Sequence, residues 1–147
     1  MLPALILLLR SFPRSYSCVP QLHRPTQELA IGSISVYSSR AHAFVAVVPS
    51  TQHVDNGDIC DGDSYQQRLW TRAECLSHLL INGPSSMWVA SDDSPRSVVP
   101  MPPEWLKGSV LKIFEGQSTC CMRCHEGRDR CDRELLVQPM LGMYGKL

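Results

Sequence analysis

The stretch that decides the fold is AFVAVVP, which occupies residues 43–49. Six apolar residues follow one another without alternation, and a proline ends the run. This pattern is typical of a strand that is covered by helices on both faces of a parallel sheet. We therefore predict a central strand at residues 43–48 in an α/β domain whose small, mainly parallel sheet is flanked by helices.

A polar loop and a helix are predicted after this strand. Residues 50–63 are polar, and Ser64 and Gln67 then have the spacing of a capping box. Asp63 is a competing cap one residue earlier, and Asp61 is a further candidate. Apolar residues recur at helical spacing as far as Gly83 and Pro84, so we predict a helix over residues 64–81. Its apolar face comprises Tyr65, Leu69, Ala73, Leu76 and Leu80.

Two further elements are predicted, one before this strand and helix and one after them. A short helix is expected at residues 28–40, before the first strand. A second short strand is expected at residues 87–90, after the helix. Strand, helix and strand in this order predict a right-handed crossover between parallel strands.

The residue pattern after residue 90 predicts less regular structure than the pattern before it. Residues 91–103 are rich in Ser, Asp and Pro and are expected to form a surface loop. A third strand is expected at residues 110–114. A closing helix is predicted at residues 132–143, with Asp132 as its N-cap and a bend at Pro139.

Composition and charge narrow the function classes. The chain has 147 residues, of which 44% are apolar and 19% are charged, so it has room for one compact domain. Fourteen basic side chains balance fourteen acidic ones. Bulk charge therefore predicts neither a nucleic acid nor an anionic membrane as partner.

The N-terminal residues are interpreted separately from the domain. We predict a leader or unstructured segment at residues 1–28 and a single domain at residues 29–147. The apolar run at residues 2–9 is far shorter than the roughly 20 residues of a transmembrane helix, so no membrane span is expected. A cytoplasmic location is favoured. Secretion or transit to an organelle stays open, because the run has the length of a signal-peptide core and Arg and Ser follow it.

The expected helix carries Trp70 and, four residues later, Glu74. Together with the strand at residues 43–48 and with Tyr65, this arrangement resembles part of a Toll/interleukin-1 receptor (TIR) domain. The resemblance covers about residues 33–90 and implies a truncated TIR or flavodoxin-like fold. It implies a recognition or signalling module that binds a protein or a nucleotide, with other TIR-like domains or a second copy as partners. In the TIR members that hydrolyse NAD, the matching Glu is the catalytic carboxylate, so an NAD glycohydrolase using Glu74 is the alternative.

Candidate ligand-binding residues lie on the same helix. Arg68 and Arg72 are four residues apart, and two like charges at this spacing destabilise a helix unless an anionic group binds there. We therefore expect Tyr65, Arg68, Trp70 and Arg72 to form the binding surface. Over a longer span the chain resembles a group of uncharacterised algal and protist proteins. They share an Arg-x-Trp-x-Arg-x-Glu helix and a late Cys-Cys segment that is followed by Cys-Asp.

A cysteine-rich segment is the candidate metal site. Its possible ligands are Cys120, Cys121, Cys124, His125 and Cys131. Thiolate and imidazole are the ligands that zinc prefers, with Cys121 and Cys124 on a knuckle. The Cys-x-x-Cys-His pattern also matches the haem attachment motif, so haem is an alternative. A reduced Cys-rich loop without a cofactor is the third possibility.

Overall fold

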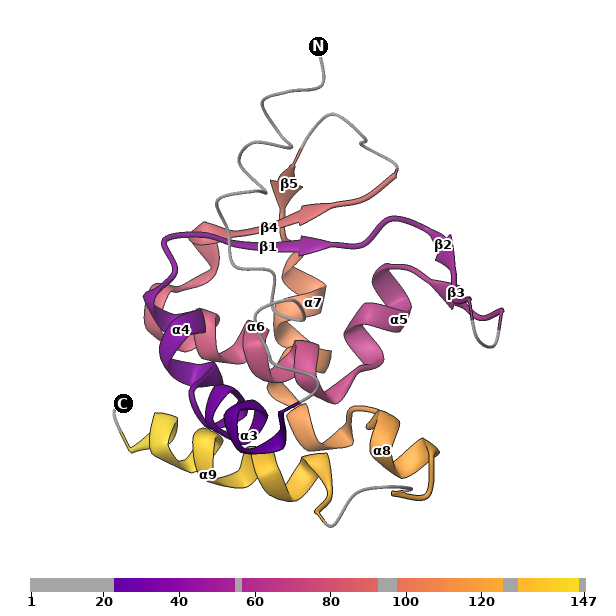
Figure 1. The fold of residues 1–147 in the computed structure, drawn as a ribbon. Helices are drawn as coiled ribbons and strands as arrows, with labels where there is room; N and C mark the ends of the chain where they lie inside the picture. Colours follow the sequence, from indigo (N-terminus) through magenta and orange to yellow (C-terminus); the bar gives the residue numbers. More distant parts are fainter. Residues whose placement is uncertain (1–22, 55–56, 93–97, 126–129, 146–147) are drawn as a thin grey trace.

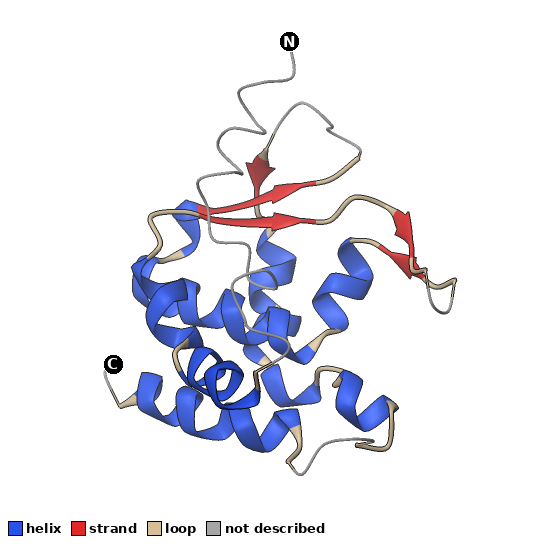
Figure 2. Ribbon diagram, viewed as in Figure 1, coloured by secondary structure: helices blue, strands red, loops and turns tan. Residues whose placement is uncertain are grey.

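The fold is an α/β arrangement in which a small sheet lies on one side of a layer of helices (Figures 1 and 2). The structure is a computed structural model, and it describes residues 23–54, 57–92, 98–125 and 130–145. The expected α/β class is confirmed. The predicted leader lies mostly outside the described residues.

The larger sheet has three strands in the order β1, β4, β5. Strand β1 (Phe44–Val47) pairs in parallel with β4 (Met87–Ala90), and β5 (Val99–Pro100) pairs antiparallel with β4. The strand prediction for residues 87–90 is confirmed. The sheet is mixed rather than mainly parallel, and within the described chain β4, not β1, is its central strand.

Burial along β1 explains why its central position was predicted wrongly. Ala46 is 1% exposed and faces the helices, whereas Val47 is 49% exposed. The helices lie on one side of the sheet only (Figure 1). The apolar run therefore reflects one buried face and one partly exposed apolar face, because strand side chains alternate between the two faces.

The residues after β1 form a short hairpin within the predicted loop. Strand β2 (Thr51–Gln52) pairs antiparallel with β3 (Ile59–Cys60). Asp61 then caps the next helix, because its carboxylate accepts from the Ser64 amide at 2.9 Å. The Ser64 hydroxyl accepts from the Asp61 amide at 2.8 Å, which completes a capping box. Of the predicted caps, Asp61 is confirmed, whereas Ser64 and Asp63 are wrong.

The helix predicted at residues 64–81 is two helices, α5 (Gly62–Gln67) and α6 (Leu69–Asn82). They meet at Arg68, whose backbone is extended. The Leu69 amide donates to the Gln117 carbonyl at 2.8 Å, and the Gln117 amide donates to the Gln67 carbonyl at 2.6 Å. These bonds to a distant segment replace helical bonds at the break, so the periodicity alone did not reveal it.

Helix α6 is the centre of the structure. Residues 73–78 are all buried, so the helix is covered on every side rather than on one face. It connects β1 to β4 and packs against α4 (Ile34–Arg40) and α9 (Asp132–Tyr144). Gly83 ends it with a φ of 73°, as predicted for a glycine cap.

The N-terminal helical prediction corresponds to two helices. Helix α3 (Arg24–Gly32) precedes α4, and the break between them lies at Ser33. Because α3 begins at Arg24 and packs against α9, the predicted domain boundary after residue 28 falls inside a packed helix.

The expected strand at residues 110–114 is wrong. Two short 3₁₀ turns, η2 (Ser109–Leu111) and η3 (Ile113–Glu115), occupy these residues. Val110 in η2 and Ile113 in η3 are the buried side chains of these turns. The predicted loop also holds β5, and helix α7 (Pro103–Lys107) begins at its end. A further 3₁₀ turn, η1 (Pro84–Ser86), leads into β4.

The closing helix is confirmed as α9, which continues through Pro139. Its N-cap is Cys131 rather than Asp132. Helix α8 (Thr119–Met122) comes before it in the chain.

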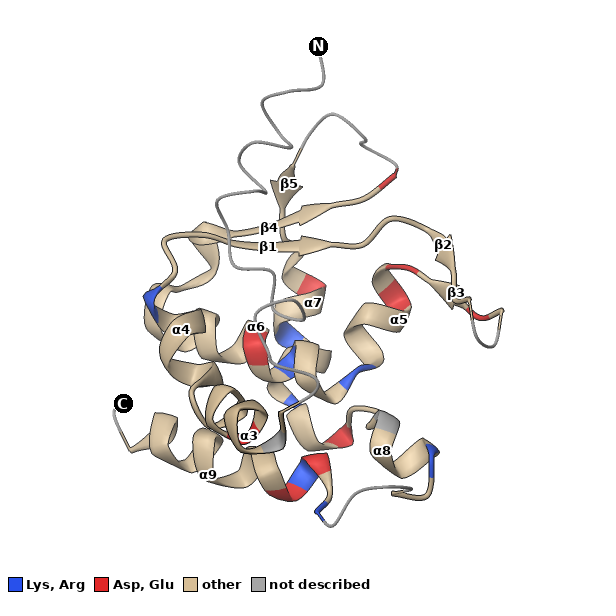
Figure 3. Ribbon diagram, viewed as in Figure 1, with Lys and Arg blue, Asp and Glu red and all other residues tan. Residues whose placement is uncertain are grey.

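Charged side chains of both signs lie on the helices and loops, and none lies in β1, β4 or β5 (Figure 3). This distribution agrees with the balanced composition of the chain. No helix in the described ranges combines the length and the apolar character that crossing a membrane requires.

Gly116 provides a test of the contact that interrupts the helix at Arg68. A Cβ at this position would lie 2.9 Å from the Ile113 carbonyl oxygen and 2.9 Å from the backbone of Leu69. We expect Gly116→Ala to lower the free energy of unfolding by about 1–3 kcal/mol, because backbone atoms have no room to move aside. Chemical denaturation measures this difference.

Gly142→Ala is the matched control, because a Cβ there meets nothing within 4 Å. Since Gly142 lies inside α9, alanine is expected to stabilise the protein by about 0.5–1 kcal/mol. Equal stability of the two variants would contradict the close approach at Gly116.

Candidate metal centre

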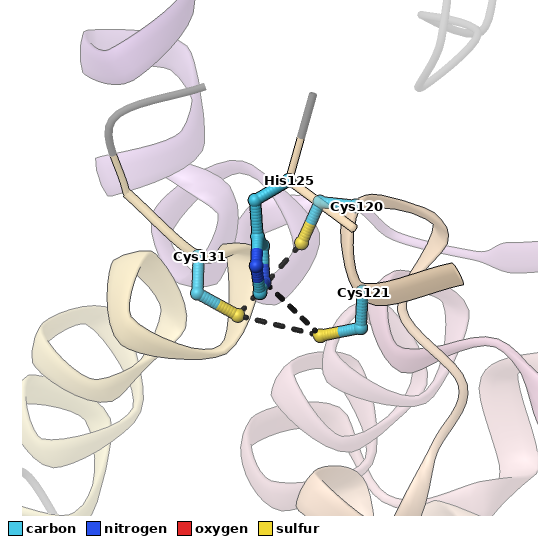
Figure 4. Close-up of side chains that lie close together, drawn as sticks. All are labelled: Cys120, Cys121, His125 and Cys131. Atoms are coloured by element: carbon cyan, nitrogen blue, oxygen red, sulfur yellow. Dashed lines mark hydrogen bonds between the residues drawn. The ribbon is translucent and has the colours of Figure 1, made fainter. Parts of the chain in front are cut away.

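Four side chains converge where α8 approaches the start of α9: Cys120, Cys121, His125 and Cys131 (Figure 4). Their ligand atoms all lie within 4.8 Å of one another. The Cys131 sulfur is 3.8 Å from that of Cys120 and 3.5 Å from that of Cys121. Nε2 of His125 is 3.5 Å from the Cys121 sulfur. This cluster could hold a metal ion.

A tight turn after α8 places His125 in the cluster. The His125 amide donates to the Cys120 carbonyl at 2.7 Å, and the Cys124 amide donates to the Cys121 carbonyl at 3.1 Å. Cys124 and His125 both have a left-handed backbone, with φ of 49° and 60°. This conformation is uncommon for residues other than glycine, although His adopts it more readily than most, and strained residues cluster at functional sites.

Cys120 is the most shielded sulfur of the cluster. Its residue is 2% exposed, and its sulfur accepts from the Asp132 amide at 3.2 Å. The hydroxyl of Ser118 lies 3.0 Å from the same sulfur. The Asp132 amide is at the N-terminus of α9, where backbone N–H groups stabilise negative charge on a sulfur.

Asp132 connects the cluster to α6. Its carboxylate is 2% exposed and accepts from Nε1 of Trp70 at 3.2 Å. The hydroxyl of Ser118 is 3.4 Å from the same carboxylate oxygen. These contacts link Trp70 on the buried helix, through Asp132 and Ser118, to the Cys120 sulfur. Hydrogen-bonded side chains of this kind orient the ligands of protein metal sites.

The structure brings together four of the five predicted ligands. Cys124 is exposed and is not a member of the cluster. Cys121 lies near Cys131 instead of forming the expected knuckle with Cys124. Ser118 and Asp132 were not predicted as site residues, because the sequence around Asp132 indicates only a helix cap.

The predicted ligand-binding residues have separate roles in the fold. Arg72 donates to the Gln66 carbonyl at 2.5 Å and to the Lys112 carbonyl at 2.8 Å, and burial lowers its pKa. Trp70 donates to Asp132. Of the four predicted residues, Arg68 is the exposed one, and it lies at the break between α5 and α6.

Tyr65 lies in a small hollow rather than at the metal cluster. Its ring stacks on Trp105 with 6.3 Å between centroids, and its hydroxyl is 3.7 Å from the Cys75 sulfur. Burial, followed by the charge on Cys75, raises the pKa of Tyr65 well above its usual range. Burial also raises the pKa of the Cys75 thiol to about 12.

The predicted catalytic carboxylate belongs to α6. Glu74 is 9% exposed, and its negative charge contributes to the raised pKa values of Tyr65 and Cys75. The hollow beside Tyr65 has a volume of about 10 Å³, which is room for about one water molecule, and Glu74 does not line it. A small-molecule site needs a far larger space.

Comparison of the chain with models of known protein families, with curated proteins and with solved structures gives no match. The cluster is therefore interpreted from its own chemistry and geometry.

The raised pKa of Cys75 predicts a loss of stability at alkaline pH. The folded protein retains the thiol proton above pH 9, where the unfolded chain releases it. The free energy of unfolding should therefore fall as pH rises above 9, by up to about 1.4 kcal/mol per pH unit from this group. Denaturation of the wild type and of Cys75→Ala at a series of pH values from 8 to 10.5 measures the difference. Parallel pH profiles for the two proteins would contradict the burial of a neutral thiol.

Proposed function

We propose that this chain is a zinc-binding protein and that Cys120, Cys121, His125 and Cys131 form a structural zinc centre. The observation that carries the proposal is the mutual approach of the four ligand atoms within 4.8 Å. In a tetrahedral zinc site with Zn–S bonds of about 2.3 Å, neighbouring sulfurs are about 3.8 Å apart. The sulfur–sulfur distances of 3.8 and 3.5 Å agree with this geometry.

The donor set favours zinc over other cofactors. Three sulfurs and one imidazole nitrogen suit a soft or borderline metal, whereas magnesium and calcium prefer oxygen ligands. Attachment of haem would use Cys121 and Cys124 together. In the cluster, however, the Cys121 sulfur lies beside Cys131 and His125, and Cys124 is not a member.

The centre is proposed to be structural because protein side chains supply all four tetrahedral ligands. A catalytic zinc site keeps one position for water or substrate. Bound zinc would join the turn that contains His125 to the start of α9. Through Asp132 and Trp70 it would also be linked to α6, so the metal would stabilise the contact between the C-terminal segment and the rest of the fold.

For the molecule as a whole we propose the recognition role that its likeness to TIR domains implies. Its support is the parallel unit of β1, α6 and β4, which leaves Arg68 exposed at the start of α6. An exposed guanidinium suits a carboxylate or phosphate on a protein or nucleotide ligand. The zinc centre would stabilise the helix that carries this surface.

Metal analysis tests the zinc proposal. Protein purified under reducing conditions should contain one zinc per chain, and removal of zinc by a chelator should lower Tm. Cys121→Ser and Cys131→Ser should each weaken zinc binding by more than about 100-fold, because loss of a supporting residue alone typically costs 10–100-fold.

Cys124→Ser is the matched control, since it removes an exposed thiol from the same turn. It should leave the stoichiometry and the affinity unchanged. Equal zinc affinity in all three variants, or zinc loss only with Cys124→Ser, would contradict the assignment.

An assay of nicotinamide release separates the recognition role from the glycohydrolase alternative. Because Glu74 is buried and does not line the hollow beside Tyr65, we expect the zinc-loaded protein to release no nicotinamide from NAD. Turnover that Glu74→Gln abolishes would instead establish an enzyme. Circular dichroism of both proteins checks that they are folded.

A further inference from the structure

We infer that Cys121 and Cys131 form a redox-sensitive pair, which a peroxide oxidises to a disulfide with release of the metal. This inference rests on the proposed zinc centre and assigns it a modification site. The two sulfurs are 3.5 Å apart, which is shorter than the 3.8 Å between Cys120 and Cys131. Figure 4 shows both sulfurs pointing toward each other.

Solvent exposure distinguishes Cys121 and Cys131 from Cys120, the third thiol of the cluster. Cys121 is exposed and Cys131 is partly exposed, so a small oxidant can reach them from solvent. Cys120 is buried, accepts from the Asp132 amide and has the Ser118 hydroxyl beside it. Oxidation should therefore begin at Cys121 and leave Cys120 reduced.

The reaction has two balanced steps. The Cys121 thiolate attacks one oxygen of hydrogen peroxide, the O–O bond breaks, hydroxide leaves, and Cys121 becomes a sulfenic acid. The Cys131 thiolate then attacks the sulfenic sulfur, the S–O bond breaks, a second hydroxide leaves, and the disulfide forms. Two electrons pass from the thiolates to one peroxide, and a dithiol reductant reverses the change.

The disulfide would remove two of the four metal ligands. Cys120 and His125 would remain, and two ligands do not complete the tetrahedral site. The sulfurs need to approach by about 1.5 Å from their present separation to reach the disulfide bond length of about 2.05 Å. Cys131 is the N-cap of α9, so this movement would act on the end of the helix that Asp132 connects to α6.

The test treats the full-length, zinc-loaded protein with increasing hydrogen peroxide. A chromophoric chelator reports released zinc, and peptide mass mapping without reduction reports the disulfide. We expect one zinc to be released for each disulfide formed, a bond between Cys121 and Cys131, and recovery of zinc binding after a dithiol is added. Cys124→Ser and Cys60→Ser, which remove thiols outside the cluster, should behave as the wild type.

The outcomes separate the two proposals. Untreated protein that contains no zinc contradicts the proposed function. Zinc-containing protein that retains its metal in excess peroxide contradicts the redox inference alone. The inference is also wrong if the disulfide includes Cys120, or if Cys124→Ser prevents zinc release.

Discussion

The burial of α6 on all sides is the constraint on which the rest of the structure depends. A helix buried around its whole circumference needs cover from several directions, and α4, η2, η3 and α9 pack directly against it. Buried side chains of the sheet belong to the same core cluster. The polar side chains of α6 therefore need partners inside the protein. His78 is fully buried, and its Nδ1 donates to the Ser38 carbonyl at 2.9 Å, while its Nε2 lies 2.8 Å from the Ser86 hydroxyl. These contacts connect the helix before β1 to the turn before β4.

The candidate metal cluster extends this organisation to the C-terminal segment. In this segment α9 packs into the core through Leu136, Met140 and Met143. The short part before α9 buries less surface and is linked to α6 and α9 by specific contacts, which include the backbone bonds of Gln117, the bond from Trp70 to Asp132 and the sulfur cluster. A metal bound by the cluster would stabilise the same segment, and oxidation of two of its ligands would act on the same contacts. The two proposals thus concern one structural link between α8, α9 and α6.

The accuracy of the sequence predictions depended on whether a pattern was local. The strand at residues 87–90 and the helix that became α9 were found, because hydrophobic patterns and end signals lie within each segment. The break at Arg68 was missed because Gln117, far along the chain, supplies the competing hydrogen bonds. For the candidate metal site, the prediction from residue types contained all four members of the cluster and one further residue, Cys124. Spacing favoured Cys124 as a ligand, whereas the turn through two left-handed residues brings His125 to Cys121.

By itself the sequence determined the α/β class, the order of β1, α6 and β4, and the segment that holds the candidate metal ligands. These properties follow from periodicity, chain order and ligand chemistry, all of which can be read along the chain. Only the tertiary structure decided that β1 is at the edge of the described sheet, that Arg72 binds backbone carbonyls, and that Cys131 rather than Cys124 joins Cys121. The place of β1 and the bond from Arg72 to the Lys112 carbonyl depend on residues that are distant along the chain. The contact of Cys121 with Cys131 depends on the path of the chain between them, and local preference specifies neither.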